Sequence, residues 1–511
     1  PVPIYSSVGL RKLGGYLDNT FHIVVKSAAK ILLTNGLIKG LLGTIAAQAP
    51  ALKDVVAVES LRRARETFKP ETVTLDDTCF LQFTSGSTSK PKGVVVSHGN
   101  IAANVHAIMD LGLKVEAGAD SGVSWLPLYH DMGLIGFVLA PLYRRNTISF
   151  LPPMLFLKRP VRWLETICRH RANISFGPNF AYALCVKRVR DKQIEGLDLS
   201  TWRAAGCGAE PIRADNLRAF AERFASIGFN PKAFMPCYGM AESTLAISFG
   251  KLGGGVAIDQ VDAAELAAEK KAKPARGEGT LALVNLGKAF SGHDLAVFDL
   301  DDRESKSPLP DRVVGEVRLR GPSIAQGYFD DAELTRQSLA GGWLCTGDLG
   351  YLVDGDVFIC GRSKELIIIN GRNYYPQDLE WEASKVQGVR KGNVVAFGTR
   401  KPLNDRERVV VLYETSIGDS QARDALNAEV RKLVRQATGL AVDDVVPLDA
   451  GVLPKTSSGK LKRGVARELY ETGKLFTETS IRDAAPLTAA KEIARSQLGY
   501  VKHALFGDKK S

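Results

Sequence analysis

The hydrophobic pattern of the first part of the chain alternates between short apolar runs and helical stretches. Between about Leu10 and Thr74, the runs Ala29–Thr34 and Val55–Val58 have the length and composition of strands, and helical periodicity separates them. Strands that alternate with helices favour a parallel sheet that is buried on both faces.

A polar loop follows, between two further apolar runs. Asp77–Phe83 predicts a strand that enters the loop, and Gly93–His98 predicts a strand that leaves it. The loop combines hydroxyl side chains, glycines and lysines and has no acid, in the order Thr84, Ser85, Gly86, Ser87, Thr88, Ser89, Lys90, Pro91, Lys92 and Gly93. Glycines allow a close approach to a ligand, and consecutive amides and hydroxyls can wrap an anion, so the loop suits a polyphosphate. A polar surface loop is the simpler interpretation, and a Walker-type loop is excluded because Pro91 stands where its second glycine would fall.

Two helices are indicated by their caps and composition. One begins at His98–Asn100 and runs to about Met109, capped by Ser97 or Asn100. The other spans Asp262–Lys273, is rich in Ala, Glu and Lys, and stops at Pro274. Composition alone makes this second helix an exposed surface helix.

The later part of the chain changes from α/β alternation to short alternating strands. The segments Leu295–Leu300, Gly315–Leu319 and Val357–Ile359 predict a small antiparallel barrel or sheet. Strands near Val394, Val409 and Val445 and a helix over Asp419–Thr438 then predict a compact α+β unit, and Thr488–Leu498 is a candidate amphipathic helix.

Composition bounds the class of protein. The 511 residues suggest about three folding units, and a hydrophobic share of 45% with a charged share of 24% is ordinary for a globular protein. The net charge of +11 allows nucleic acid, an anionic membrane surface or anionic substrates as partners. Because the cations are spread along the chain without an arginine-rich block, nucleic-acid binding is not expected, and smaller anionic partners are the more natural ones.

The cysteines and the apolar runs indicate the cellular compartment in which the protein is expected. The seven cysteines are scattered and form no C-x-x-C pair, so we expect reduced thiols, no disulfide frame and no structural zinc. No apolar run reaches the ~20 residues that a membrane span needs, and no secretory signal is visible, so we expect a cytoplasmic protein. The chain opens at Pro1 without a methionine, and we expect that an N-terminal portion is missing.

The polyphosphate loop carries a family resemblance. TSGST-x-x-PKG followed by V-x-x-SH resembles the nucleotide-phosphate loop of the acyl-adenylate-forming enzymes, which include acyl-CoA synthetases, non-ribosomal adenylation domains, luciferases and fatty acyl-AMP ligases. The resemblance implies that Thr84, Ser85, Gly86, Ser87, Thr88 and Lys92 bind the nucleotide phosphates, with Lys90 as an alternative cation and Thr84 near the metal. Ser89 departs from the family's usual glycine.

Three further segments resemble parts of the same family's site. WLP-x-x-HDMGL-x-G places His130 in the acyl pocket beside the reacting carboxylate, although a lone His-Asp pair is more often a structural hydrogen bond. GPNFAY implies that Gly177, Asn179 and Phe180 border the acyl tunnel, which must be largely apolar. GAEP implies that Gly208, Ala209, Glu210 and Pro211 present the backbone to adenine, with Cys207 replacing the commoner Asn or Ser.

The nucleotide site is completed by residues far along the chain. YG-x-x-E-S-T implies that Tyr238 and Gly239 contact adenine and that Glu242 holds Mg²⁺, whereas a solvated glutamate at a helix start is the simpler interpretation. A TGD signature implies that Asp348 accepts hydrogen bonds from both ribose hydroxyls; a bare Gly-Asp would be a turn.

The last motifs lie in the C-terminal unit. By resemblance, Arg362 contacts ribose and phosphate, Lys364 is the hinge, and the N-x-YPQD-L-E run from Asn373 to Glu380 is closer to fatty acyl-AMP ligases than to CoA ligases. P-x-T-x-SGK-x-x-R implies that Lys460 bridges the carboxylate and the α-phosphate. On any other Ser/Gly loop such a lysine would be solvated.

We therefore expect an α/β fold with a large N-terminal domain of layered α/β subdomains, a small β-barrel-like subdomain and a small mobile α+β C-terminal lid. The expected ranges are 1–361 for the large domain, with an insertion at 250–280 and the β-rich part at 282–360, 362–477 for the lid, and 478–511 for a helical tail. The resemblance implies an ATP- and Mg²⁺-dependent fatty acyl-AMP ligase that passes its acyl group to an acyl carrier protein. An insertion at 250–280, which in such ligases restrains the lid, favours this acceptor. An acyl-CoA synthetase of the same fold and a non-catalytic scaffold are the alternatives.

Overall fold

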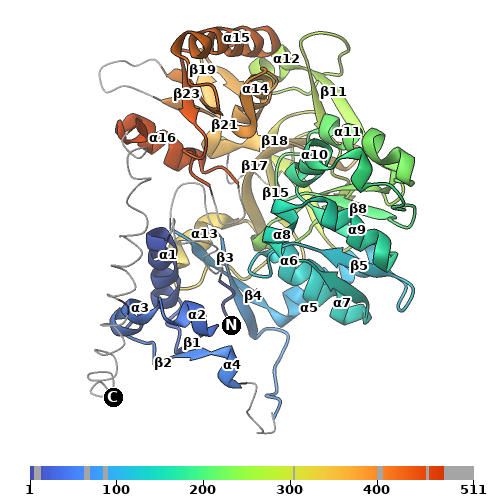
Figure 1. Ribbon diagram of the computed structural model, residues 1–511, viewed down its shortest axis with the longest axis vertical. Coiled ribbons are helices and arrows are strands. Elements are labelled where there is room, and N and C mark those ends of the chain that lie inside the picture. Colours follow the sequence, from blue (N-terminus) through green and yellow to red (C-terminus); the bar gives the residue numbers. More distant parts are fainter. Residues whose placement is uncertain are drawn as a thin grey trace.

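The computed structural model describes residues 1–4, 13–61, 69–84, 90–302, 305, 307–399, 407–455, 460–476 and 496. Its first elements are α1 (Leu13–Lys26), β1 (Ile31–Thr34), α2 (Gly36–Lys39), α3 (Gly43–Gln48), β2 (Asp54–Ala57) and α4 (Val58–Leu61), at the bottom of Figure 1. The predicted pairing is confirmed, because β1 and β2 are parallel. The prediction that both faces are buried is wrong for this pair: Leu32 is buried, but Ile31 and Leu33 are 58% and 56% exposed. In the described part of the chain this sheet has two strands, and one of its faces packs on the helices.

The two strands predicted around the polar loop form an antiparallel hairpin. They are β3 (Thr78–Thr84) and β4 (Lys92–Ser97), which confirms the prediction. Helix α5 (His98–His106) follows and is continued by a π-helix over Ala107–Gly112. Both candidate caps take part: the Ser97 hydroxyl accepts from the Asn100 N–H, and the Asn100 side chain accepts from the Ser97 N–H.

A seven-stranded sheet forms the centre of the molecule, in the order β13-β10-β9-β8-β7-β5-β6. Five of its strands are parallel: β5 (Ser121–Ser124), β6 (Thr147–Phe150), β7 (Ile174–Gly177), β8 (Ala204–Cys207) and β9 (Phe234–Tyr238). Helices cover the sheet (Figure 1): α6 (Asp131–Leu134), α7 (Ala140–Arg144), α8 (Pro153–Lys158), α9 (Val161–His170), α10 (Asn179–Arg188) and α11 (Ala214–Phe224). The core beneath them includes the fully buried Trp163, Tyr182 and Phe220.

The β-rich part is an antiparallel sheet, as predicted. It contains β14 (Asp294–Phe298), β15 (Gly315–Arg320), β16 (Leu339–Ala340), β17 (Trp343–Val353) and β18 (Asp356–Arg362). Nearby, β11 (Ile258–Asp262) and β12 (Thr280–Val284) form a separate two-stranded sheet, and α13 (Ala332–Ser338) precedes β16. The short strands β10 (Ser248–Phe249) and β13 (Lys288–Ala289) belong to the seven-stranded sheet.

The helix predicted over residues 262–273 is shorter and less exposed than expected. It is α12 (Ala263–Glu269), capped by Asp262, whose side chain accepts from two backbone N–H groups. It ends because Lys270 adopts the left-handed conformation, with φ of 54°, and the chain returns to β-bridges. Leu266 and Ala267 are 1% and 8% exposed, so one face of α12 is core.

The C-terminal unit has the predicted α+β elements. They are β19 (Ile367–Ile369), β20 (Arg372–Tyr374), α14 (Pro376–Ser384), β21 (Val389–Thr399), β22 (Arg408–Thr415), α15 (Ser420–Thr438), β23 (Asp444–Asp449) and α16 (Arg463–Glu471). Helix α12 lies beside this unit in Figure 1, and Ala267 belongs to the same hydrophobic cluster as Ile367 and Leu379. The helix predicted over residues 488–498 falls largely outside the described residues.

The structure bears on disulfide bonds and on membrane-spanning helices. All seven cysteines are free, so the expected absence of disulfides is confirmed. Within the described ranges, no helix combines the length and the apolar character needed to cross a bilayer.

Candidate functional site

The parallel strands deliver four of the predicted segments to one edge of the central sheet. His130 lies in the loop after β5, Asn179 follows β7, Glu210 follows β8 and Glu242 follows β9. All four strands are parallel, so their carboxyl ends meet at the same edge. This edge is where open α/β sheets bind their ligands.

The His130 ring lies against the carboxylate of the next residue. Its Nδ1 contacts Asp131 Oδ1, which also accepts from the Met132 N–H at 2.7 Å. Burial alone would raise the pKa of Asp131, but His130 and Lys460 outweigh it and hold this pKa below its usual value. The Gln82 side chain of β3 donates to the Tyr129 carbonyl at 3.1 Å, so the hairpin that carries the polar loop also fixes the His130 segment.

The turn after β8 is built for close backbone contact. Ala209 has a φ of 66°, and a Cβ on Gly208 would lie 2.5 Å from Cys237 Sγ. Glu210 accepts from the Phe180 N–H at 2.6 Å, and burial raises its pKa despite this bond. Cys207 is buried in the main core, so its thiol does not reach the open side of the turn.

The segment predicted for the acyl tunnel lies against aromatic rings. A Cβ on Gly177 would be 3.4 Å from Trp163 and 3.5 Å from Trp125, and the Phe180 ring stands edge-on to Trp125 at 6.0 Å. Asn179, in contrast, is used by the fold, because its Oδ1 accepts from the backbone N–H of Arg213 at 3.2 Å.

Asp348 is held by two of the other predicted residues. Its Oδ2 accepts from the Tyr238 hydroxyl at 2.8 Å and its Oδ1 from Arg362 Nε at 2.9 Å. Asp348 and Arg362 face each other in the β17–β18 ladder, so the sheet itself sets this pair. Beside Tyr238, a Cβ on Gly239 would lie 1.9 Å from the Leu245 carbonyl oxygen, so the chain can pass there only with glycine.

Glu242 is oriented by a tyrosine that the sequence did not single out. The Tyr328 hydroxyl donates to Glu242 Oε1 at 2.7 Å, and Lys92 Nζ lies 5.9 Å from the Tyr328 ring centre. Tyr328 is brought there by backbone pairing with β4, since the Phe329 N–H donates to the Gly93 carbonyl at 2.8 Å. Of the loop itself, Thr84, Lys90 and Lys92 are described, and Ser85, Gly86, Ser87, Thr88 and Ser89 lie outside the described residues.

The oxygen-bearing side chains of the site limit how it could bind Mg²⁺. In the described part of the chain no group of three His, Cys, Asp or Glu side chains could hold a metal. Mg²⁺ is usually bound through one or two carboxylates together with substrate phosphates and water. A single half-buried carboxylate, Glu242, with the Thr84 end of β3 as a second oxygen donor, therefore fits a metal that arrives with a nucleotide.

Lys460 enters this site from the C-terminal unit. Asp131, Glu210 and Asp348 each favour its charged form, and Arg362 opposes it. Burial is the largest influence and lowers the pKa of Lys460 below its usual value. The lysine is thus desolvated among residues from β17 and from the loops after β5 and β8, a position that suits a cation that follows moving negative charge.

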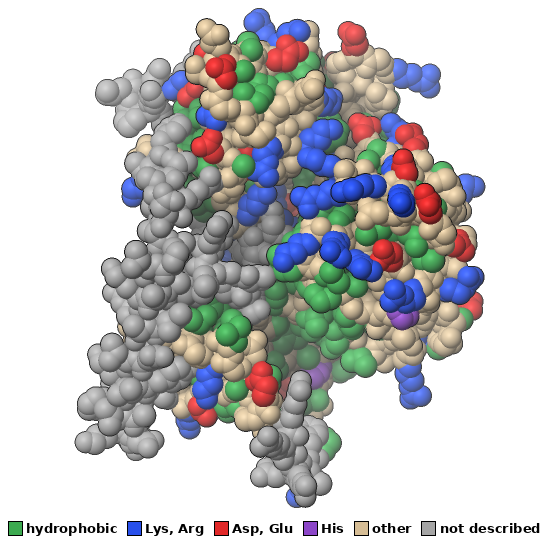
Figure 2. Space-filling view, viewed as in Figure 1, with side chains coloured by type: hydrophobic (Ala, Val, Ile, Leu, Met, Phe, Trp, Pro, Cys, Tyr) green, Lys and Arg blue, Asp and Glu red, His purple; other side chains and the backbone are tan. Residues whose placement is uncertain are grey.

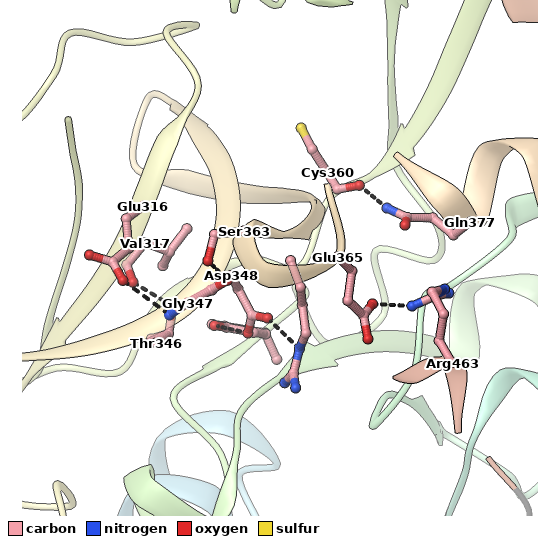
Figure 3. A network of polar contacts seen from close by, with 12 residues as sticks. Glu316, Val317, Thr346, Gly347, Asp348, Cys360, Ser363, Glu365, Gln377 and Arg463 are labelled. Carbon is pink, nitrogen blue, oxygen red and sulfur yellow. Dashed lines mark hydrogen bonds and ion pairs between the residues drawn. The ribbon is translucent and has the colours of Figure 1, made fainter. Parts of the chain in front are cut away.

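The sequence also missed the residues that anchor Lys460 and the C-terminal unit. Arg463 pairs with Glu365 (Figure 3) and with Glu380 Oε1, the latter at 2.8 Å. Arg213, just before α11, pairs with Asp378 at 3.2 Å. Lys364, the predicted hinge, is exposed in the short 3-10 helix Ser363–Glu365. Arg463 stands in the lysine motif and could have been found there, whereas Arg213 has no local signal.

The fold and this constellation define an adenylate-forming enzyme. A tyrosine and a carboxylate on the sheet edge, an aspartate on a β-rich unit and a lysine from a C-terminal unit converge on one site. The AMP-binding enzyme family model matches residues 17–329, and the chain belongs to that family.

Individual relatives agree. A provisionally named acyl-CoA synthetase of Caulobacter vibrioides is 41% identical over 480 residues, which cover 93% of this chain and 82% of that protein. A medium-chain-fatty-acid–[acyl-carrier-protein] ligase of Teredinibacter turnerae is 36% identical over 77% of this chain and 63% of its own length. A structure from a study of fatty acyl-adenylate ligases from E. coli and L. pneumophila has a TM-score of 0.86 at 35% identity, covering 93% of this chain and 84% of that one. The resemblance to fatty acyl-AMP ligases drawn from the motifs is confirmed.

Proposed function

We propose that this chain activates a fatty acid as its acyl-AMP and passes the acyl group to the phosphopantetheine thiol of an acyl carrier protein. The fatty acid carboxylate attacks the α-phosphorus of ATP in line, the bond to the β-phosphate oxygen breaks, and pyrophosphate leaves. The attacking group belongs to the substrate, so the protein contributes positioning and charge neutralisation.

The observation that carries the proposal is the place of Lys460. The ammonium of half-buried Lys460 lies within the electrostatic influence of Asp131, Glu210 and Asp348. A cation between the acyl segment and the ribose aspartate can neutralise the carboxylate as it approaches and the α-phosphate as charge builds there. His130 and Asp131 then serve to orient this region, and no covalent intermediate on His130 is required.

The remaining residues hold the nucleotide. Asp348 takes the ribose hydroxyls, and Arg362 beside it, with a side chain that is 55% exposed, is free to reach the phosphates. Tyr238 and Gly239 lie along adenine with Gly208 to Pro211. Thr84, Lys90 and Lys92 frame the pyrophosphate end. Mg²⁺ on Glu242 supplies neutralisation of the leaving phosphates when it is bound.

Two features favour a carrier protein over CoA as the acceptor. The first is α12, which packs Leu266 and Ala267 into the cores around β20 and α14 and so ties the 250–280 segment to the lid. The second is basic surface: Figure 2 shows Lys and Arg side chains across the face over α8 and α10, where Lys158, Arg159, Lys187 and Arg188 are exposed. A positive face suits an acidic carrier domain.

The product decides between this function and acyl-CoA synthesis, which the name of the Caulobacter relative favours. Purified protein is given ATP, Mg²⁺, a series of fatty acids, and either CoA or a phosphopantetheinylated carrier protein. We expect acyl-AMP with CoA and acyl-carrier with the carrier protein. Substantial acyl-CoA would overturn the choice of acceptor.

The adenylation step has its own test. Lys460→Ala should abolish fatty-acid-dependent ATP–pyrophosphate exchange, since removing one charge-stabilising group costs about 10²–10³ in rate. A neighbouring exposed lysine, Lys432→Ala, is the control and should exchange normally. Normal exchange by the Lys460 variant would refute its assignment, and no exchange by the parent would support a non-catalytic scaffold.

A further inference from the structure

The Asp348 segment departs from the strand in which it lies. In the β15–β17 ladder, Glu316 is opposite Leu349 and Arg318 is opposite Cys345. One residue of β15, Val317, therefore faces three residues of β17, Thr346 to Asp348. This is a β-bulge, a device that bends a strand and redirects its side chains and that is common beside active sites.

Side chains replace the ladder hydrogen bonds that the bulge loses. Glu316 Oε1 accepts from the Gly347 N–H at 3.2 Å, and Ser363 Oγ donates to the Gly347 carbonyl at 3.1 Å. Thr346 Oγ1 donates to the Val317 carbonyl at 2.6 Å and accepts from the Asp348 N–H at 3.0 Å. Figure 3 shows these groups around Gly347 and Asp348. We call Glu316, Thr346 and Ser363 the bulge clamp.

The clamp is rigid on the side away from the site. Glu316 and Arg318 are 4% and 1% exposed, and Arg318 Nε donates to Glu316 Oε2 at 3.0 Å. The Arg318 guanidinium also stacks 4.7 Å above the Phe298 ring. Arg318, itself held against Phe298, therefore fixes the Glu316 carboxylate, which presents Oε1 to the Gly347 N–H.

The clamp in turn fixes where Asp348 points. Gly347 has a φ of 70°, which glycine adopts without strain, and its N–H and carbonyl are both held. A carboxylate has about four acceptor positions, and Tyr238 and Arg362 each use one on Asp348. The acceptor positions that are left can take hydroxyl groups only if the carboxylate stays in this orientation.

We propose that the bulge clamp positions Asp348 for the nucleotide sugar and thereby sets the discrimination between ribonucleotides and deoxyribonucleotides. This inference rests on the proposed function, because it takes ATP as the substrate and Asp348 as the ribose group. Glu316, Thr346 and Ser363 are positioning residues and do not touch the reacting atoms.

The test compares ATP with 2′-deoxy-ATP and 3′-deoxy-ATP in fatty-acid-dependent pyrophosphate exchange. Thr346→Val keeps the side-chain shape and removes the hydroxyl that joins Val317 to Asp348. We expect kcat/KM for ATP to fall about tenfold, with little change for either deoxynucleotide, so that the ribo-to-deoxy ratio collapses. Thr346→Ser should restore the ratio, and Ser363→Ala should lower it by a smaller factor.

Thr280→Val is the matched control. Thr280 also hydrogen-bonds a carbonyl, that of Gly277 at 2.8 Å, but it lies at the start of β12, outside the clamp. The ratio of kcat/KM for ATP to kcat/KM for each deoxynucleotide should be the same in Thr280→Val as in the parent protein.

An unchanged ratio in Thr346→Val, or equal losses for all three nucleotides, would overturn the inference. If Thr346→Val does not fold, Ser363→Ala decides on the same ratio. If the parent shows no exchange at all, the proposed function fails. Calorimetric binding of AMP against 2′-deoxy-AMP and 3′-deoxy-AMP by the same variants then tests the clamp by itself.

Discussion

The contact between Arg213 and the C-terminal unit offers a sharp test of how the lid is held. Arg213 Nη2 donates to the Gln377 carbonyl at 2.5 Å and to Asp378 Oδ1 at 3.2 Å. The guanidinium also lies 5.3 Å from the centre of the Trp381 ring. Arg213 belongs to the large domain and its three partners to α14, so Arg213→Ala removes a link between the two while leaving the site residues in place.

The size of the effect follows from burial. The side chains of Arg213 and Asp378 are 18% and 9% exposed, and removing one partner of a buried ion pair costs about 3–5 kcal/mol. Burial raises the pKa of Asp378, and Arg213 lowers it. Without Arg213 the pKa of Asp378 rises further, so its carboxylate can take up a proton, and this offsets part of the lost stability. Loss of the ring contact adds about 0.5–1 kcal/mol. We therefore expect the docked lid to lose about 2–4 kcal/mol, or roughly 30- to 1000-fold in its equilibrium.

Two assays report this loss. Pyrophosphate exchange should slow in Arg213→Ala because Lys460 is delivered less often, and proteolysis between the domains should speed up. Protonation of Asp378 also predicts how the defect depends on pH. Below the raised pKa of Asp378 the carboxyl group is neutral in the variant, so no unpaired charge is buried. The loss of activity in Arg213→Ala should therefore shrink as the pH falls.

Arg218→Ala is the matched control. Arg218 pairs with Asp215 at 3.1 Å on the same part of the chain, but both side chains are about 60% exposed, and such pairs contribute little. Arg213→Ala,Asp378→Asn should recover part of the loss, because no unpaired buried charge is left. Exchange and proteolysis in Arg213→Ala equal to those in Arg218→Ala would refute the reasoning.

Three further predictions concern the site itself. As the pH rises, the rate of pyrophosphate exchange should begin to fall at a lower pH than an ordinary lysine would give, because burial lowers the pKa of Lys460 and only its cation is active. In a pH–rate profile, Lys460→Arg should move this alkaline limit to higher pH. Glu242→Gln should raise the Mg²⁺ concentration at half-maximal exchange and cost roughly 10² in rate, whereas exposed Glu195→Gln should do neither. Gly239→Ala should lower the free energy of unfolding by about 1–3 kcal/mol in urea denaturation, because its Cβ would meet the Leu245 carbonyl, whereas Gly36→Ala, with nothing within 4 Å, should be neutral.

Several elements could be predicted locally. The β3–β4 hairpin, the strands of the C-terminal unit and the 19-residue helix α15 follow from period, caps and turn residues. The burial of α12 could not be predicted, because its composition is that of a surface helix. Ala267 is core because it packs with β20 and α14, and Leu266 because it packs into the cluster that contains Tyr351 and Phe358. The β1–β2 pair shows the same limit, because whether a sheet face is covered depends on the elements packed against it.

The candidate site divides in the same way. Motifs identified Glu242, Asp348 and Lys460, because each chemistry needs a particular functional group within a short run of residues. The supporting residues Tyr328, Arg213 and Glu316 have no such run, since a hydrogen bond needs only a donor at the right point in space.

The sequence by itself determined the family of this protein, because the motifs that carry the resemblance are short runs of residues. The tertiary structure decided which groups share one volume and in what orientation. Parallel strands bring His130, Glu210 and Glu242 to one edge, a bulge turns Asp348 toward them, and buried ion pairs dock the unit that carries Lys460. The physical reason is that a motif specifies functional groups that are close together in the sequence. Their orientation and pKa depend on neighbours that only the folded chain brings close.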